Sequence, residues 1–68
     1  MASQTFEKHG LRFEAGQKYT YNGQNGREWI ALRHVDGGGW QRAMAAHMTL
    51  RASRQQIVEE FEILGLFD

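Results

Sequence analysis

The sequence contains no cysteine and no proline, and its eight acidic and eight basic residues leave a formal charge of zero. Without cysteine the chain forms no disulfides and offers no thiolate ligands for zinc. The balanced charge gives no global attraction to nucleic acid or to an anionic membrane. No apolar run approaches the roughly 20 residues of a membrane helix, and residues 1–10 lack the apolar core of a signal peptide. We therefore expect a soluble, cytoplasmic protein that makes no contact with a membrane.

The chain has 68 residues and is expected to form one small globular domain over residues 1–68, with residues 1–4 frayed. A domain of this size buries only about 60% of the surface that its unfolded chain exposes. Small domains of this kind gain further stability from disulfides, a metal or a partner chain. With disulfides excluded, self-association as a homodimer is one expected source of that stability.

Glycine and asparagine mark the expected turns in the first part of the chain. Residues 5–13 predict a first strand, with Gly10 as a bulge, and the sequence Glu-Ala-Gly-Gln at 14–17 predicts a turn. Residues 22–26 contain two Asn-Gly pairs, which tolerate the positive φ angles of a tight turn. This segment is therefore predicted to be a loop.

Two further strands are expected between these turns. Residues 18–22 alternate polar and aromatic side chains, which places Tyr19 and Tyr21 on the same face. Residues 27–35 carry apolar side chains on both faces, a pattern that suits a central strand better than an edge strand.

The segment after the Asp-Gly-Gly-Gly turn at 36–39 is ambiguous. Alanine and methionine favour a helix over residues 40–50, whereas a glycine turn after a strong strand favours a hairpin partner. We predict a strand. A period of two then places one set of side chains on a common face: Trp40, Arg42, Met44, Ala46, Met48 and Leu50.

The C-terminal part of the chain predicts a helix. Ser53 followed by Gln56 forms a capping box, and Gly65 is a natural helix stop. The apolar stripe of this helix consists of Ile57, Val58, Phe61 and Leu64. The remaining apolar residues of the tail either fold back on the core or meet another molecule: Ile63, Leu66 and Phe67.

Together these elements predict an α+β fold, in which a small antiparallel sheet of three to four strands, joined by hairpins as a meander, is packed by one C-terminal helix. The helix would cover one face of the sheet and leave the other partly exposed. Residues 1–52 carry seven basic and four acidic residues, a net charge of +3, and residues 53–68 carry one basic and four acidic residues, a net charge of −3. The acidic helix would either neutralise the basic body or form a second, oppositely charged face.

No catalytic, metal or cofactor motif is present. His9, His34 and His47 are too widely spaced in the sequence to indicate a zinc site. No serine lies in a Gly-x-Ser-x-Gly context. The glycines at 36–39 are followed by Trp40 rather than by the Gly-Lys-Ser/Thr of a phosphate loop. We therefore expect a protein that is not an enzyme and holds no cofactor.

Aromatic and basic residues interleave along the predicted strands. Tryptophan, tyrosine and arginine dominate the energetics of protein–protein interfaces. The same residue types bind single-stranded nucleic acid on open sheet faces, and large aromatics also fill small cores. The predicted binding residues are Tyr19, Tyr21, Trp29, Arg33, Trp40 and Arg42.

These observations lead to two hypotheses of function. The first is a non-catalytic protein-binding module, a bacterial or phage-encoded (viral) inhibitor or regulator that occludes a site on a larger protein or nucleoprotein complex, or that self-associates. The alternative is a small nucleic-acid-binding protein that uses an aromatic and basic sheet face.

Overall fold

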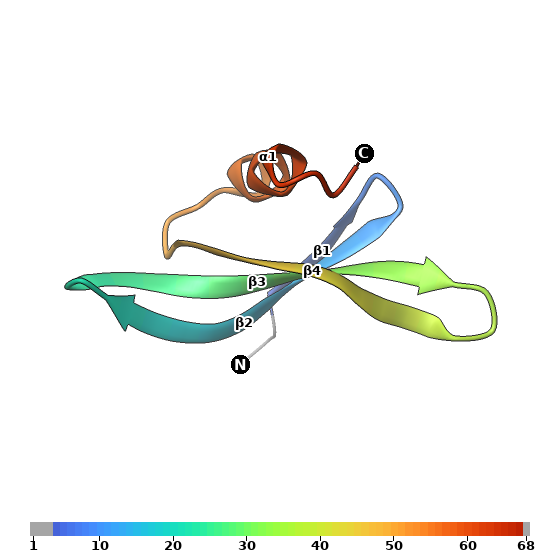
Figure 1. Ribbon diagram of the computed structural model, residues 1–68, viewed down its shortest axis with the longest axis horizontal. Helices are drawn as coiled ribbons and strands as arrows, with labels where there is room; N and C mark the ends of the chain where they lie inside the picture. The colour runs from blue at the N-terminus through green and yellow to red at the C-terminus, as the bar shows by residue number, and fades with distance from the viewer. Residues whose placement is uncertain (1–3, 68) are drawn as a thin grey trace.

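A computed structural model describes residues 4–67, and for Tyr21 it describes the backbone alone. Four strands precede one helix (Figure 1), and the sheet follows chain order as an antiparallel meander. The prediction of an α+β fold with one C-terminal helix is confirmed. The elements are β1 (Thr5–Lys8), β2 (Leu11–Tyr21), β3 (Gln24–Val35), β4 (Gly39–Thr49) and α1 (Arg54–Ile63).

The first strand prediction is wrong, because residues 5–13 form a hairpin and not one strand. His9 and Gly10 have φ angles of 55° and 76°. Positive φ at both central positions defines the two-residue turn whose twist matches that of the flanking strands. Lys8 consequently pairs with Leu11, and β1 becomes the short first edge of the sheet.

The predicted turn at residues 14–17 is also wrong, because this segment continues through β2 as a bulge. Ala15 pairs with Trp29 and Lys18 pairs with Arg27, so that two residues of β2 face one residue of β3. A Cβ atom at Gly16 would lie 2.9 Å from the Glu28 carboxylate. Glycine permits this close approach, and the extra residue bends the strand.

The Asn22–Gly23 turn is confirmed, with φ angles of 50° and 76°. The predicted loop is too long, however, because residues 24–26 belong to β3. The second Asn-Gly pair has a packing role in the sheet. A Cβ atom at Gly26 would lie 2.5 Å from the Tyr19 ring and 2.8 Å from the Met48 carbonyl oxygen.

Residues 39–49 form a strand, as predicted, but their side chains do not share one face. Ala31 pairs with Met44 and Leu32 pairs with Arg42, which leaves Ala43 as a bulge. An extra residue reverses the alternation of side chains on its two sides. The expected common face is therefore wrong, and the two residues before the bulge lie opposite those after it.

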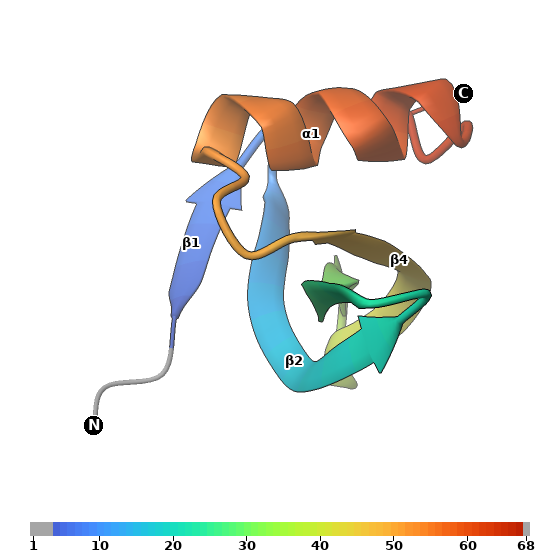
Figure 2. The same cartoon turned by 90° about the vertical axis from the view of Figure 1, so that its left-hand side faces the viewer.

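The core lies between α1 and one face of the sheet (Figures 1 and 2). The rings of Phe13 in β2 and Phe61 in α1 lie 5.4 Å apart, and both side chains are fully buried. No helix within residues 4–67 has the length and apolarity needed to cross a membrane. The buried apolar residues are Leu11, Phe13, Trp29, Ala31, Ala46, Met48, Ile57, Val58, Phe61 and Leu66.

Both ends of α1 are capped by local hydrogen bonds. At the N-terminus, the Gln56 amide donates to Ser53 Oγ over 3.2 Å, and the Ser53 amide donates to Gln56 Oε1 over 2.8 Å. At the C-terminus, Gly65 has a φ of 94° and the Leu66 amide donates to the Phe61 carbonyl over 3.0 Å. This geometry turns the chain back, so that Leu66 joins the core.

The apolar residues at the C-terminal end of α1 follow the prediction only in part. Leu64, expected on the buried stripe, is half exposed, and Ile63 is 78% exposed. Leu64 is the C-cap residue and keeps helical dihedral angles, and it is Leu66, after the turn at Gly65, that reaches the core.

We predict that Gly65→Ala lowers the free energy of unfolding by about 1 to 2 kcal/mol, because a Cβ atom is unfavourable in the left-handed conformation. Urea denaturation measures the change. The control is Ile63→Ala, which removes an exposed side chain and should cost less than about 0.5 kcal/mol. Equal costs for the two variants would contradict this account of the helix end.

Candidate functional site

One face of the sheet is free of α1, and we call it the open face. Residues paired directly across antiparallel strands lie on the same face. Arg12 and Leu32 are paired, and each alternates with buried core residues. The pairings assign the following residues to the open face: Glu7, Arg12, Glu14, Tyr19, Glu28, Ile30, Leu32, His34, Trp40, Arg42, Ala45 and His47.

A cluster around Trp40 occupies one end of the open face. The Arg12 guanidinium carbon lies 4.9 Å from the Trp40 ring centroid, and the His34 ring meets Trp40 edge-on at 5.2 Å. Glu7 Oε2 lies 3.5 Å from Arg12 Nη2 and holds the guanidinium from its other side. A cation over an exposed indole contributes about 0.5 to 1 kcal/mol. These contacts hold the half-buried tryptophan against the sheet.

A second cluster, around Tyr19, occupies the opposite end. The Tyr19 ring lies over Gly26 and meets the His47 ring edge-on, with centroids 4.7 Å apart. His47 Nε2 lies 3.8 Å from Glu28 Oε2. The histidine side chain is 62% exposed, so water surrounds the pair.

The middle of the open face is apolar. Ile30, Leu32 and Ala45 are half-buried there, although α1 lies on the other side of the sheet. Gly26 and His34 mark the two clusters on β3 and are eight residues apart, which corresponds to about 27 Å along a strand. The open face therefore presents an apolar centre between two aromatic and polar clusters.

The structure brings together only part of the predicted site. Tyr19, Trp40 and Arg42 lie on the open face. Trp29 is buried in the core, 6% exposed, with its ring 5.8 Å from that of Phe6.

The last two predicted residues also lie away from this group. Arg33 pairs with buried Leu11, so it belongs to the face covered by α1, at an exposed position beyond the helix. The side chain of Tyr21 lies outside the described part of the chain.

Sequence reasoning missed the residues that surround the predicted aromatics. Arg12, His34, Glu28 and His47 contact Trp40 or each other on the open face. Cross-strand register could have identified these residues, because each of them pairs with another member of its cluster on the neighbouring strand. That register depends on the bulges, which have no strong signature in the sequence.

The open face is mixed in charge and not basic. Its arginines, Arg12 and Arg42, are balanced by the carboxylates of Glu7, Glu14 and Glu28. In residues 4–67 there is also no group of three or more histidine, aspartate or glutamate side chains arranged to hold a metal ion. The open face therefore presents aromatic, apolar and paired charged groups side by side.

Comparison with family models, with curated proteins and with solved structures gives no match to this chain. Function is therefore inferred from the surfaces of the molecule itself.

We predict that Gly26→Ala lowers the free energy of unfolding by about 1 to 3 kcal/mol, because the added methyl group overlaps the Tyr19 ring and the Met48 carbonyl. Chemical denaturation of Tyr19→Ala, of Gly26→Ala and of the double variant Tyr19→Ala/Gly26→Ala measures the coupling free energy between the two positions. The double variant should cost less than the sum of the single variants, because the ring overlap is then absent. Strict additivity would show that Tyr19 does not pack over Gly26.

Proposed function

We propose that this chain is a non-catalytic protein-binding module that inhibits or regulates a larger protein or nucleoprotein complex by occluding a site with its open face. The main support for the proposal is the unequal cover of the two faces of the sheet. The sheet carries apolar side chains on both faces, yet α1 covers only one of them. A half-buried apolar centre with aromatic flanks is typical of a surface that a partner completes.

The dimensions of the open face suit a protein partner. A stable protein–protein interface buries about 800 Å² on each side. The open face extends over about 27 Å of β3 and spans all four strands. An interface of standard size therefore fits on it without help from other parts of the molecule.

Trp40 is the expected anchor of this interface. Tryptophan and arginine are enriched among residues whose truncation costs the most binding energy. Arg12 and His34 already hold the indole in place, so little conformational entropy is lost when a partner covers it. Arg42 and Tyr19 add polar contacts toward the two ends of the same face.

The charge of the open face favours a protein over a nucleic acid. Binding to nucleic acid draws its affinity from cations that neutralise phosphates. Here three carboxylates accompany two arginines, and Arg12 is already paired with Glu7. Arg33, which would have added positive charge, lies on the opposite face.

We predict that Trp40→Ala weakens binding to the partner by about 2 kcal/mol or more, roughly 30-fold, while the domain stays folded. The wild-type chain is first sized by light scattering and then used as bait for partner capture. Val35→Ala is the matched control, because Val35 is an exposed apolar residue of the same hairpin on the other face. It should bind as the wild type does.

The outcome against the proposal is equally clear. A monomeric chain that captures the same proteins before and after Trp40→Ala would overturn the role of the open face. Mobility shifts with single- and double-stranded probes at low salt distinguish the nucleic-acid alternative. Binding that falls steeply with salt and is lost in Arg42→Ala would replace our proposal with that alternative.

A further inference from the structure

The last strand of the sheet has a free edge. β4 pairs with β3 on one side, and no other described strand pairs with it. Every second residue of an edge strand directs its amide and carbonyl groups away from the sheet. From Met44 to Thr49 the pairing with β3 is regular, and the Ala43 bulge ends this stretch. These six residues contain no proline, lysine or acidic side chain that would discourage another strand.

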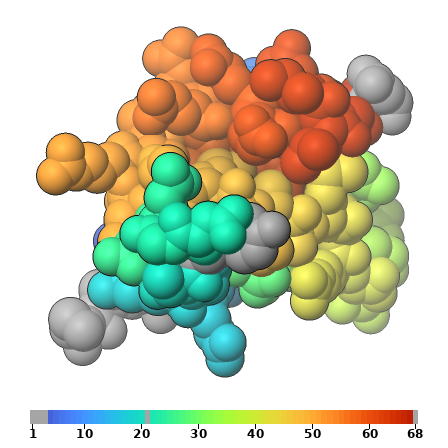
Figure 3. Space-filling view, turned by 60° about the vertical axis from the view of Figure 1, so that its left-hand side comes forward, coloured from blue at the N-terminus to red at the C-terminus, as the bar shows by residue number. Residues whose placement is uncertain are grey.

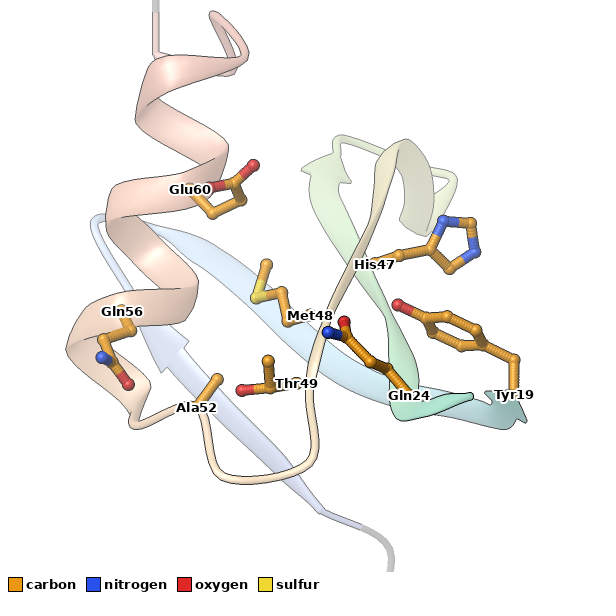
Figure 4. Close-up of a pocket in the computed structure, with 8 residues that line it drawn as sticks. All are labelled: Tyr19, Gln24, His47, Met48, Thr49, Ala52, Gln56 and Glu60. Atoms are coloured by element: carbon orange, nitrogen blue, oxygen red, sulfur yellow. The ribbon is translucent and has the colours of Figure 1, made fainter. Parts of the chain in front are cut away.

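A cavity of about 410 Å³ opens at the end of this edge (Figure 4). Met48 lines it from the core face of the sheet, whereas Tyr19 and His47 line it from the open face. Side chains from both faces of one sheet can meet the same cavity only around the rim of the sheet, here where β4 ends beside the β2–β3 hairpin. In space-filling view, β4 is visible between α1 and the tip of the β2–β3 hairpin (Figure 3).

The helix forms the other wall of this cavity. Gln56 and Glu60 of α1 line the cavity opposite Met48 and Thr49 of β4, and Ala52 lies between the two elements at one end (Figure 4). A groove between an edge strand and a helix is the geometry in which several peptide-binding domains receive an extended segment. We call this feature, Met44–Thr49 together with the cavity, the edge groove.

We propose that the edge groove binds an extended, basic segment of a partner protein, which adds to β4 as a fifth strand. Backbone hydrogen bonds along Met44–Met48 supply affinity, because the Thr49 carbonyl already accepts from the Ala52 amide over 3.2 Å. The cavity receives one side chain of the segment, which supplies specificity. Six residues of strand correspond to about 20 Å. A short peptide segment is therefore long enough to occupy the whole edge groove.

The charge of the groove selects a basic segment. Glu60 is the one carboxylate among the side chains that line the cavity, and it is half-buried. α1 as a whole carries three glutamates and one arginine, a net charge of −2, and Glu60 is the one of these charged residues that lines the cavity. The other polar lining groups are the hydroxyl and amide groups of Tyr19, Gln24, Thr49 and Gln56, together with His47, whose Nε2 lies 3.8 Å from Glu28 Oε2. A lysine or arginine side chain gains attraction in this cavity, whereas an acidic one is repelled.

A second copy of the chain fits the edge groove less well. Antiparallel pairing of two β4 strands creates a two-fold axis perpendicular to the sheet, and this axis places both helices on the same face. The Glu60 side chains of the two copies would then lie on the same side of the β4–β4 junction, where their like charges repel each other. The Ala43 bulge of each copy would also interrupt a longer ladder. These features favour a partner of different sequence.

A display library of random nine-residue peptides tests the proposal, with the full chain as the target. We expect selection on the wild type to enrich lysine or arginine at one position, among residues with high strand propensity. Amide signals of Met44–Thr49 should shift when the selected peptide is added. The peptide should bind Glu60→Lys about tenfold more weakly. Glu62→Lys, the same charge change at an exposed site on the same helix outside the cavity, should bind within about twofold of the wild type.

Three results would overturn the proposal. They are the absence of any basic enrichment, selected peptides that bind Glu60→Lys as well as they bind the wild type, and a dimer in which the β4 edge is protected by a second copy. The open face is tested separately, because Trp40 pairs with His34 at the other end of β4. Trp40→Ala should leave peptide binding within about twofold, so that either surface can fail without the other.

Discussion

α1 covers only a small part of the sheet, and the rest of the structure depends on this limited cover. Ten residues of helix measure about 15 Å and are about 10 Å wide, whereas β2, β3 and β4 each measure about 36 to 40 Å. The helix also runs across the strands and not along them (Figures 1 and 2). Each long strand therefore gives the core only two buried apolar side chains. These are Leu11 and Phe13, Trp29 and Ala31, and Ala46 and Met48.

The consequences of this short cover are visible at both ends of the sheet. The tip of the β3–β4 hairpin, residues 33–39, extends beyond the helix and is exposed throughout. On the open face, the apolar centre is flanked by contacts to two half-buried aromatic rings, from the Arg12 guanidinium to Trp40 and from the His47 ring to Tyr19. A domain with a small core and this much uncovered apolar surface gains stability when a partner covers that surface. The small core is therefore one physical reason for the proposed binding function.

The two proposed surfaces differ in physical character and complement each other. The open face offers shape, aromatic anchors and balanced charge, which suit a broad contact with a folded protein. The edge groove offers unpaired backbone groups beside an acidic helix wall, which suit a single extended segment. One partner could reach both, because β4 contributes Trp40 and Arg42 to the first surface and Met44–Thr49 to the second.

The local signals in the sequence predicted the helix and the Asn22–Gly23 turn well, and the first two strands and the faces of the sheet poorly. The Ser53–Gln56 capping box and the Asn22–Gly23 turn are determined by neighbouring residues, so they could be predicted without tertiary information. The bulges at Gly16 and Ala43 could not, because their position is set by packing across the sheet. A bulge reverses side-chain alternation, and this is why Trp40 was expected beside Met44.

The position of the helix also escaped prediction. Both faces of β3 carry apolar residues, and only the placement of α1 decides that Trp29 is core while Ile30 belongs to the open face. The candidate site was therefore predicted in part. Residue type indicated Tyr19, Trp40 and Arg42, but their charged neighbours depend on a register that the sequence does not reveal.

Solvent exposure of methyl groups on the two faces tests the central claim most directly. A soluble paramagnetic probe should strongly relax the methyl protons of Ile30, Leu32 and Ala45. It should relax those of Ala31 and Ile57 only weakly, because α1 covers them. This difference would establish a sheet covered on one side. Equal protection of both sets would show that the isolated chain already covers the open face, and would contradict the account.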